Sequence, residues 1–124
     1  MKVIMDKYYI IEDIIFMPKK SKEEDMSVYS LLKKSGYFKF HREINEIDIF
    51  EVLSKTPECV SQWLAWSEDK RTGPGWHFEK TQSEKYYIVS HYPPKTNLKP
   101  IVSFDKIAAC AAFIKKEIER IRKS

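Results

Sequence analysis

The sequence SQWLAWSEDKRTGPGWHF, residues 61–78, separates two parts of the chain that have different patterns. It contains all three tryptophans, a dense run of opposite charges, and the Gly73-Pro74-Gly75 segment, which cannot continue a helix. Upstream of it, hydrophobic residues recur at helical spacing. Downstream they alternate as in strands, and one last helical pattern follows. Helices followed by strands predict an α+β fold.

The length of 124 residues is that of one domain. We therefore expect a single domain over 1–124, with a mainly helical part at 1–70 and a β-meander plus a C-terminal helix at 76–122. Charged residues interrupt every apolar run before it reaches the ~18 residues that a membrane span needs. The N-terminus also lacks the pattern of a signal peptide. We therefore expect a cytoplasmic protein without membrane contact.

The first segment, residues 1–17, has hydrophobic residues at three- and four-residue spacing, which favours a helix. Its many β-branched residues are also compatible with a strand. Pro18 should end this segment, because the residue before a proline is driven out of the α region. Residues 19–25 are then expected to form a charged loop.

A short helix is predicted over Met26–Ser35, with Gly36 as its C-cap. The stretch GYFKFHREI that follows, residues 36–44, alternates with a period of two. This pattern fits either a short extended segment or a loop anchored by its aromatic residues.

Two more helices are predicted before the junction. Asn45 is a suitable cap for a helix over Glu46–Ser54, whose first turn is acidic. Thr56 as a cap and Pro57 at the first helical position indicate another helix that runs to about Asp69.

The second part of the chain predicts three short strands, at residues 76–80, 85–92 and 101–104. Their order suggests an antiparallel meander. Asp105 should cap a C-terminal helix over 106–122, whose hydrophobic stripe would pack on the sheet. The residues expected on its solvated side are Lys115, Lys116, Glu117, Glu119, Arg120 and Arg122.

No motif for catalysis, metal binding or cofactor binding is present. The histidines His41, His77 and His91 lack the spacing of a zinc site. Ser90 and His91 are neighbours in a predicted strand, so their side chains point to opposite faces, which argues against a dyad. The chain has only three glycines, too few for a phosphate-binding loop. We therefore expect no catalytic residues, no metal and no cofactor, in a protein that is not an enzyme.

The two cysteines, Cys59 and Cys110, each stand alone inside a predicted helix. Neither belongs to a CxxC pair. We expect both to be buried, free thiols in a reducing compartment, with a disulfide between them as the less favoured alternative.

Charge is unevenly distributed along the chain. Residues 1–70 carry 11 basic and 13 acidic residues, whereas residues 71–124 carry 11 basic and 5 acidic residues. The basic second part, with aromatic residues on its predicted strands, would suit a nucleic-acid-binding sheet. The simpler interpretation is that the C-terminal helix covers one sheet face and takes half of those aromatic residues into the core.

The junction also fits a protein-binding surface, because tryptophan, tyrosine and arginine dominate the binding energy of interfaces. A helix end that runs into a loop is a common place for binding residues. The alternative is that the tryptophans belong to the core and that the charges form a solvated helix end. An acidic segment, Glu23–Asp25, is a second candidate patch. The candidate partner-binding residues are Trp66, Glu68, Asp69, Arg71, Trp76 and His77.

A wider motif extends from the junction to the C-terminal helix. Its residues are Trp63, Trp66, Ser67, Lys70, Arg71, Gly75, Trp76, Phe78, Tyr87, Val89, Ala109, Ala111, Phe113 and Ile114. Over residues 27–122 the chain thereby resembles a group of small bacterial proteins similar to the immunity proteins of polymorphic toxins, including those of contact-dependent inhibition. The resemblance implies a non-catalytic protein that binds a cognate toxin tightly and neutralises it by occlusion. Nucleic acid is the alternative partner.

The sequence pI of about 9.0 departs from the acidic character usual for inhibitors of basic nuclease toxins. Under this resemblance, either the toxin is not a basic nuclease or the acidic first part of the chain makes the contact.

Overall fold

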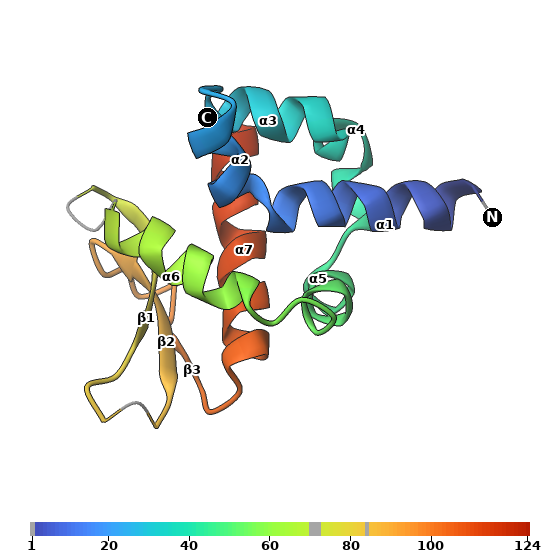
Figure 1. Ribbon diagram of the computed structural model, residues 1–124. Helices are drawn as coiled ribbons and strands as arrows, with labels where there is room; N and C mark the ends of the chain where they lie inside the picture. The colour runs from blue at the N-terminus through green and yellow to red at the C-terminus, as the bar shows by residue number, and fades with distance from the viewer. Residues whose placement is uncertain (1, 70–72, 84) are drawn as a thin grey trace.

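The computed structural model describes residues 2–69, 73–83 and 85–124, with side chains from residue 7 onward. Helices come first, then a three-stranded antiparallel sheet and a C-terminal helix, which confirms the α+β fold. Figure 1 shows this last helix, α7 (Lys106–Lys123), between the sheet on one side and the helices α1 and α5 on the other. One hydrophobic core therefore joins both parts of the chain.

The first segment is helical, as the spacing favoured. Helix α1 spans Lys2–Ile15, and Phe16 interrupts the helical structure after it. The first helix thus ends before Pro18, as predicted, but a second helix, α2 (Met17–Glu23), follows at once, so the predicted loop at 19–25 was wrong. Pro18 lies in the first turn of α2, where a missing backbone N–H breaks no helical hydrogen bond.

Helix α3 (Val28–Ser35) ends at Gly36, which has the left-handed φ of 97° expected of a C-cap. The next residues form a short helix, α4 (Tyr37–Phe40), and the 3₁₀ turn η1 (His41–Glu43). Neither the extended segment nor the loop predicted for this stretch was correct. The carbonyl of Gly36 accepts the first bonds of α4, and Tyr37 is fully buried, so tertiary packing outweighs the alternating pattern.

Asn45 caps α5 (Glu46–Leu53) with a reciprocal capping box, in which its side chain and that of Asp48 each accept a backbone N–H at 2.9 Å. Helix α6 spans Cys59–Asp69. It begins later than predicted, because the chain enters it through a turn closed by the bond from the Cys59 N–H to the Thr56 carbonyl, 3.0 Å long. The predicted cap at Thr56 was therefore wrong.

The sheet has the order β1 (Gly75–Lys80), β2 (Tyr87–Tyr92), β3 (Ile101–Ser103), and both neighbouring pairs are antiparallel. Phe78 lies opposite Val89 in this register. Both side chains are buried on the face that α7 covers. The predicted meander is thus present, with β3 one residue shorter than expected.

Helix α7 carries the largest part of the core. Asp105 caps it by accepting two backbone N–H bonds of 2.9 and 3.2 Å. Phe113 stacks on Phe78 of β1, with ring centroids 5.5 Å apart. Within the residues that the structure describes, no helix is both long enough and apolar enough to cross a membrane.

The prediction that Glu117 is solvated was wrong. Its side chain has no exposed surface. Position 117 lies three residues after Ile114 and four before Ile121, so it belongs to the buried stripe of the helix.

The thiols Cys59 and Cys110 are both buried and free, as expected. Burial raises the pKa of each thiol, since an apolar environment disfavours the thiolate.

Candidate protein-binding site

A groove of about 580 Å³ opens between the C-terminal half of α6 and the sheet. Leu64, Ser67 and Glu68 of α6 form one wall. Strands β1 and β2 form the other with His77, Phe78, Glu79, Lys80, Ser90 and Tyr92. Two regular elements therefore supply the walls, which gives the groove a defined shape.

One buried hydrogen bond joins the two walls. The backbone N–H of Phe78 donates to Oγ of Ser67 at 2.7 Å, and Ser67 is only 3% exposed. This N–H points away from β2, so α6 covers the outer edge of β1. The width of the groove is thus set by a contact between residues eleven positions apart.

The lining of the groove combines polar, charged and aromatic side chains. His77 lies opposite Ser90 across β1 and β2. The ring of His77 is held by a 3.0 Å bond from Nε2 to the Gly73 carbonyl. Tyr92 is 57% exposed. Charged residues of both signs, Glu68, Glu79 and Lys80, also line the groove.

The described hydrogen bonds do not join Ser90 and His77 as a nucleophile and its base. A serine nucleophile needs a histidine within hydrogen-bond reach that is in turn oriented by an acid. In the described ranges, no hydrogen bond joins Ser90 to His77, and the Nε2 atom of His77 is used by Gly73. The same part of the chain holds no group of three His, Cys, Asp or Glu side chains that could bind a metal ion.

The structure brings two of the predicted partner-binding residues, Glu68 and His77, together in the groove. Asp69 is exposed at the end of α6. Arg71 lies outside the described residues. The second predicted patch, Glu23–Asp25, lies away from the groove, at the end of α2.

The two predicted tryptophans face inward. The ring of Trp66 is half-buried, and its indole N–H donates to Glu117 at 2.9 Å. Trp76 is only 9% exposed, and the Lys116 ammonium lies 4.4 Å from its ring centroid. Both rings therefore contact α7 and lie beneath the elements that form the groove.

The predicted contacts did not include seven of the groove residues: Leu64, Ser67, Phe78, Glu79, Lys80, Ser90 and Tyr92. The strand alternation could have identified three of them, because Glu79, Ser90 and Tyr92 share the sheet face of His77. Ser67 falls on the apolar side of α6, where a polar residue needs a partner.

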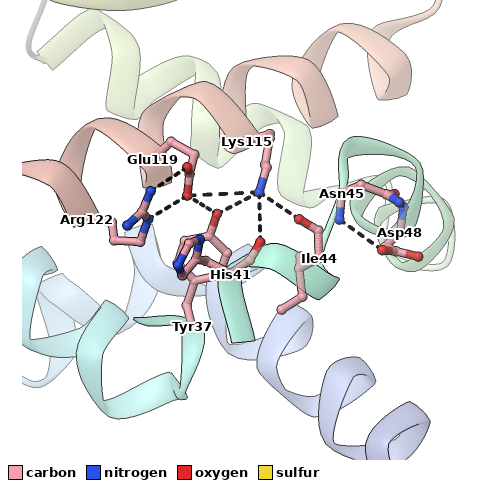
Figure 2. Close-up of polar contacts among 8 residues, drawn as sticks. All are labelled: Tyr37, His41, Ile44, Asn45, Asp48, Lys115, Glu119 and Arg122. Carbon is pink, nitrogen blue, oxygen red and sulfur yellow. Dashed lines mark hydrogen bonds and ion pairs between the residues drawn. The ribbon is translucent and has the colours of Figure 1, made fainter. Parts of the chain in front are cut away.

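A second polar cluster lies behind α7. Figure 2 shows the ammonium of Lys115 among oxygen atoms of α4, η1 and the loop before α5. It donates to the Tyr37 hydroxyl at 2.8 Å and to the Ile44 carbonyl at 2.7 Å, with the His41 carbonyl at 3.4 Å. All three N–H groups of the ammonium are thereby used.

The Tyr37 hydroxyl in turn donates to the carboxylate of Glu119. Arg122 holds the same carboxylate with two bonds of 3.0 Å (Figure 2). These hydrogen bonds lower the pKa of Glu119 to about 2, and the bonds from Arg122 have the largest effect. Burial and the Glu119 carboxylate raise the pKa of Tyr37, and burial lowers that of Lys115. Because Tyr37 is fully buried, this cluster is an anchor between helices rather than an open site.

The sheet aromatics divide between the two faces. Phe78 and Trp76 are buried beneath α7, as the simpler interpretation expected. On the other face lie Tyr92 and the edge-to-face pair of Tyr86 and Phe104, whose centroids are 5.9 Å apart.

Comparison of the chain with protein-family models, with curated proteins and with solved structures finds no match.

Proposed function

We propose that this chain is a non-catalytic protein-binding module and that the groove between α6 and the sheet is its contact surface. The observation that carries the proposal is the position of Glu68 and His77. These residues, predicted from the sequence as partner contacts, line one groove beside the exposed ring of Tyr92.

The physical properties of the groove support protein binding. Tyr92 offers a large, rigid contact area at a low cost in side-chain entropy. The bond between Ser67 and Phe78 fixes the walls before a partner arrives, which reduces the entropy lost on association. A protein loop with one apolar and one basic side chain would match Tyr92 and the carboxylate of Glu79.

The resemblance to immunity proteins supports a bacterial toxin as the partner. Neutralisation would then occur by occlusion, with the toxin's active-site surface seated on the groove. The groove carries both signs of charge, with the carboxylates of Glu68 and Glu79 and the ammonium of Lys80, so a protein surface with complementary charges of both signs would fit it.

The test is binding to the protein encoded by the neighbouring reading frame, by co-expression and by calorimetry on the purified pair. We expect the toxin to be neutralised and to co-purify with the chain. Tyr92→Ala and Glu79→Lys should each weaken binding by about tenfold or more, equivalent to ~1.4 kcal/mol. The matched control is Tyr9→Ala, because Tyr9 is 55% exposed on α1, away from the groove.

Lethality that persists on co-expression, without co-purification, would overturn the toxin as the partner. Groove variants that bind as well as the control would overturn the groove as the surface. Binding to short RNA or DNA at ~50 mM salt, with a steep loss at higher salt, would favour the nucleic-acid alternative instead.

A further inference from the structure

The two edges of the sheet are protected to different degrees. The outer edge of β1 is covered by α6, with the Phe78 N–H bonded to Ser67. Strand β3 is the other edge, and no strand of the described residues pairs with its outer side. An uncovered edge strand is a template for pairing, and proteins usually block it with charge, proline or a bulge.

Of these devices, β3 has a proline directly before it, Pro100, but no charge. Ile101, Val102 and Ser103 are uncharged, and so is Phe104 directly after the strand. Val102 is 58% exposed and Phe104 is 81% exposed, the largest value among the large hydrophobic side chains with described burial. This edge is therefore apolar as well as unpaired.

The register shows which backbone groups face outward. Since the N–H of Phe78 points away from β2, Phe78 and Val89 form a non-hydrogen-bonded pair. The polar backbone groups of Val89 then face β3, toward its partner Ile101. Because the backbone N–H and C=O groups of successive residues point to opposite edges of a strand, the N–H and C=O of Val102 face outward, where they can pair with another strand.

We propose that β3 pairs antiparallel with β3 of a second copy of this chain, about a two-fold axis that passes between the two Val102 residues. Each Val102 would exchange both backbone hydrogen bonds with its symmetry mate. The two three-stranded sheets would become one sheet of six strands. This proposal is independent of the function assigned to the groove.

Residues at mirrored positions around the axis are complementary. With Val102 on the axis, Phe104 lies opposite Pro100 of the second copy, and its N–H faces the carbonyl of that proline. The chain bends at Phe104, so the ladder ends there, and beyond it Lys99 of one copy would lie near Asp105 of the other, a proximity of opposite charges that occurs twice by symmetry. Lys99 and Asp105 are both exposed, and the backbone of Asp105 is extended, with φ −92° and ψ 109°. A second copy therefore fits this edge without a clash of like charges.

The geometry leaves the groove accessible. The axis is perpendicular to the sheet, so both α7 helices lie on one side and both α6–β1 grooves lie at the far edges. Burial is small for a protein interface, and we expect a dissociation constant of about 10–300 µM.

The first experiment is sedimentation of the full chain between about 1 µM and about 1 mM, a range that brackets this affinity. We expect reversible dimerisation. Val102→Lys should abolish it by placing two like charges on the axis, whereas Ile47→Lys, at a residue 67% exposed on α5, should leave it unchanged. Lys99→Asp should weaken the dimer, and Lys95→Asp, with the same change of charge in the preceding loop, should not.

The second experiment keeps the proposal testable if Val102→Lys fails to fold. Val102→Cys should form an intermolecular disulfide under mild oxidation, because paired residues at ~5.5 Å between Cα atoms can be bridged. Ile47→Cys is the control. Cys59 and Cys110 are buried and should not interfere. A chain that stays monomeric at about 1 mM, or equal cross-linking of both cysteine variants, would overturn the proposal.

Discussion

The indole nitrogen of Trp66 lies 2.9 Å from a carboxylate oxygen of Glu117, a side chain with no exposed surface. The bond connects α6, which forms one wall of the groove, to α7, which supports the sheet. A buried carboxylate is costly unless its oxygens accept hydrogen bonds. Trp66 therefore contributes to the position of the groove wall as well as to the core.

Replacement of Trp66 by phenylalanine should destabilise the fold by about 1–3 kcal/mol, because the buried carboxylate of Glu117 loses a donor. The free energy of unfolding, measured in urea, gives the size of the effect. In a double-mutant cycle with Glu117→Met, which removes the acceptor oxygens, the two substitutions should be strongly non-additive. Additive effects would show that the indole contributes only its packing.

The stability of the protein should fall in acid partly through Glu119. Its pKa in the folded state, about 2, is below the value near 4.5 of an unperturbed glutamate, so protonation favours the unfolded chain. The stabilisation is present above about pH 5 and is lost as pH falls toward 2, with a size of about 1–2 kcal/mol after solvent screening. Glu119→Gln should remove this part of the pH dependence in urea titrations between pH 2 and 6.

The control for that experiment is Glu51→Gln, at an exposed carboxylate on α5. It should retain the wild-type profile. If both variants retain it, the pair of Glu119 and Arg122 has no net effect on stability.

Truncation to alanine should cost much more stability at Phe113 than at Phe104. Phe113 is fully buried and stacks on Phe78, so Phe113→Ala should cost about 3–5 kcal/mol through the cavity that it leaves. Phe104→Ala removes the same atoms from a side chain that is 81% exposed and contacts the ring of Tyr86, so the loss should not exceed about 1 kcal/mol. Thermal unfolding of both variants at low protein concentration separates these outcomes. A loss at Phe104 comparable to that at Phe113 would contradict its exposed position.

The thiols should be inert in the folded protein. Burial raises the pKa of Cys110 and of Cys59, which suppresses the reactive thiolate at neutral pH. Alkylation followed by mass spectrometry should show both thiols protected under native conditions and both modified in denaturant. Fast modification of the native protein at either thiol would show that α6 or α7 opens locally.

Local signals in the sequence predicted most of the elements. Asn45 and Asp105 act as helix caps because a short polar side chain can satisfy the first free N–H groups, which depends on few distant contacts. The alternating pattern of 85–92 likewise predicted β2, which has one face on α7. These helix caps and this strand pattern depend on residues within a few positions of one another in the sequence.

Features that depend on distant contacts were not predictable in this way. Tyr37 is in a helix because its ring is buried and its hydroxyl bonds Lys115, 78 residues away. Glu117 could be identified as buried only from its place on the helical stripe, and its partner Trp66 is 51 residues distant. The groove depends on how α6 crosses the edge of β1, which no local pattern specifies.

The position of α7 has a consequence for biosynthesis. The helix is contacted by the sheet and by α3, α5 and α6, yet it is encoded after all of them. While residues 106–123 are still inside the ribosome, the emerged helices and strands lack the surface on which they pack. We therefore expect the nascent chain to remain incompletely collapsed until this segment leaves the exit tunnel, and to acquire its tertiary structure in one late, cooperative step.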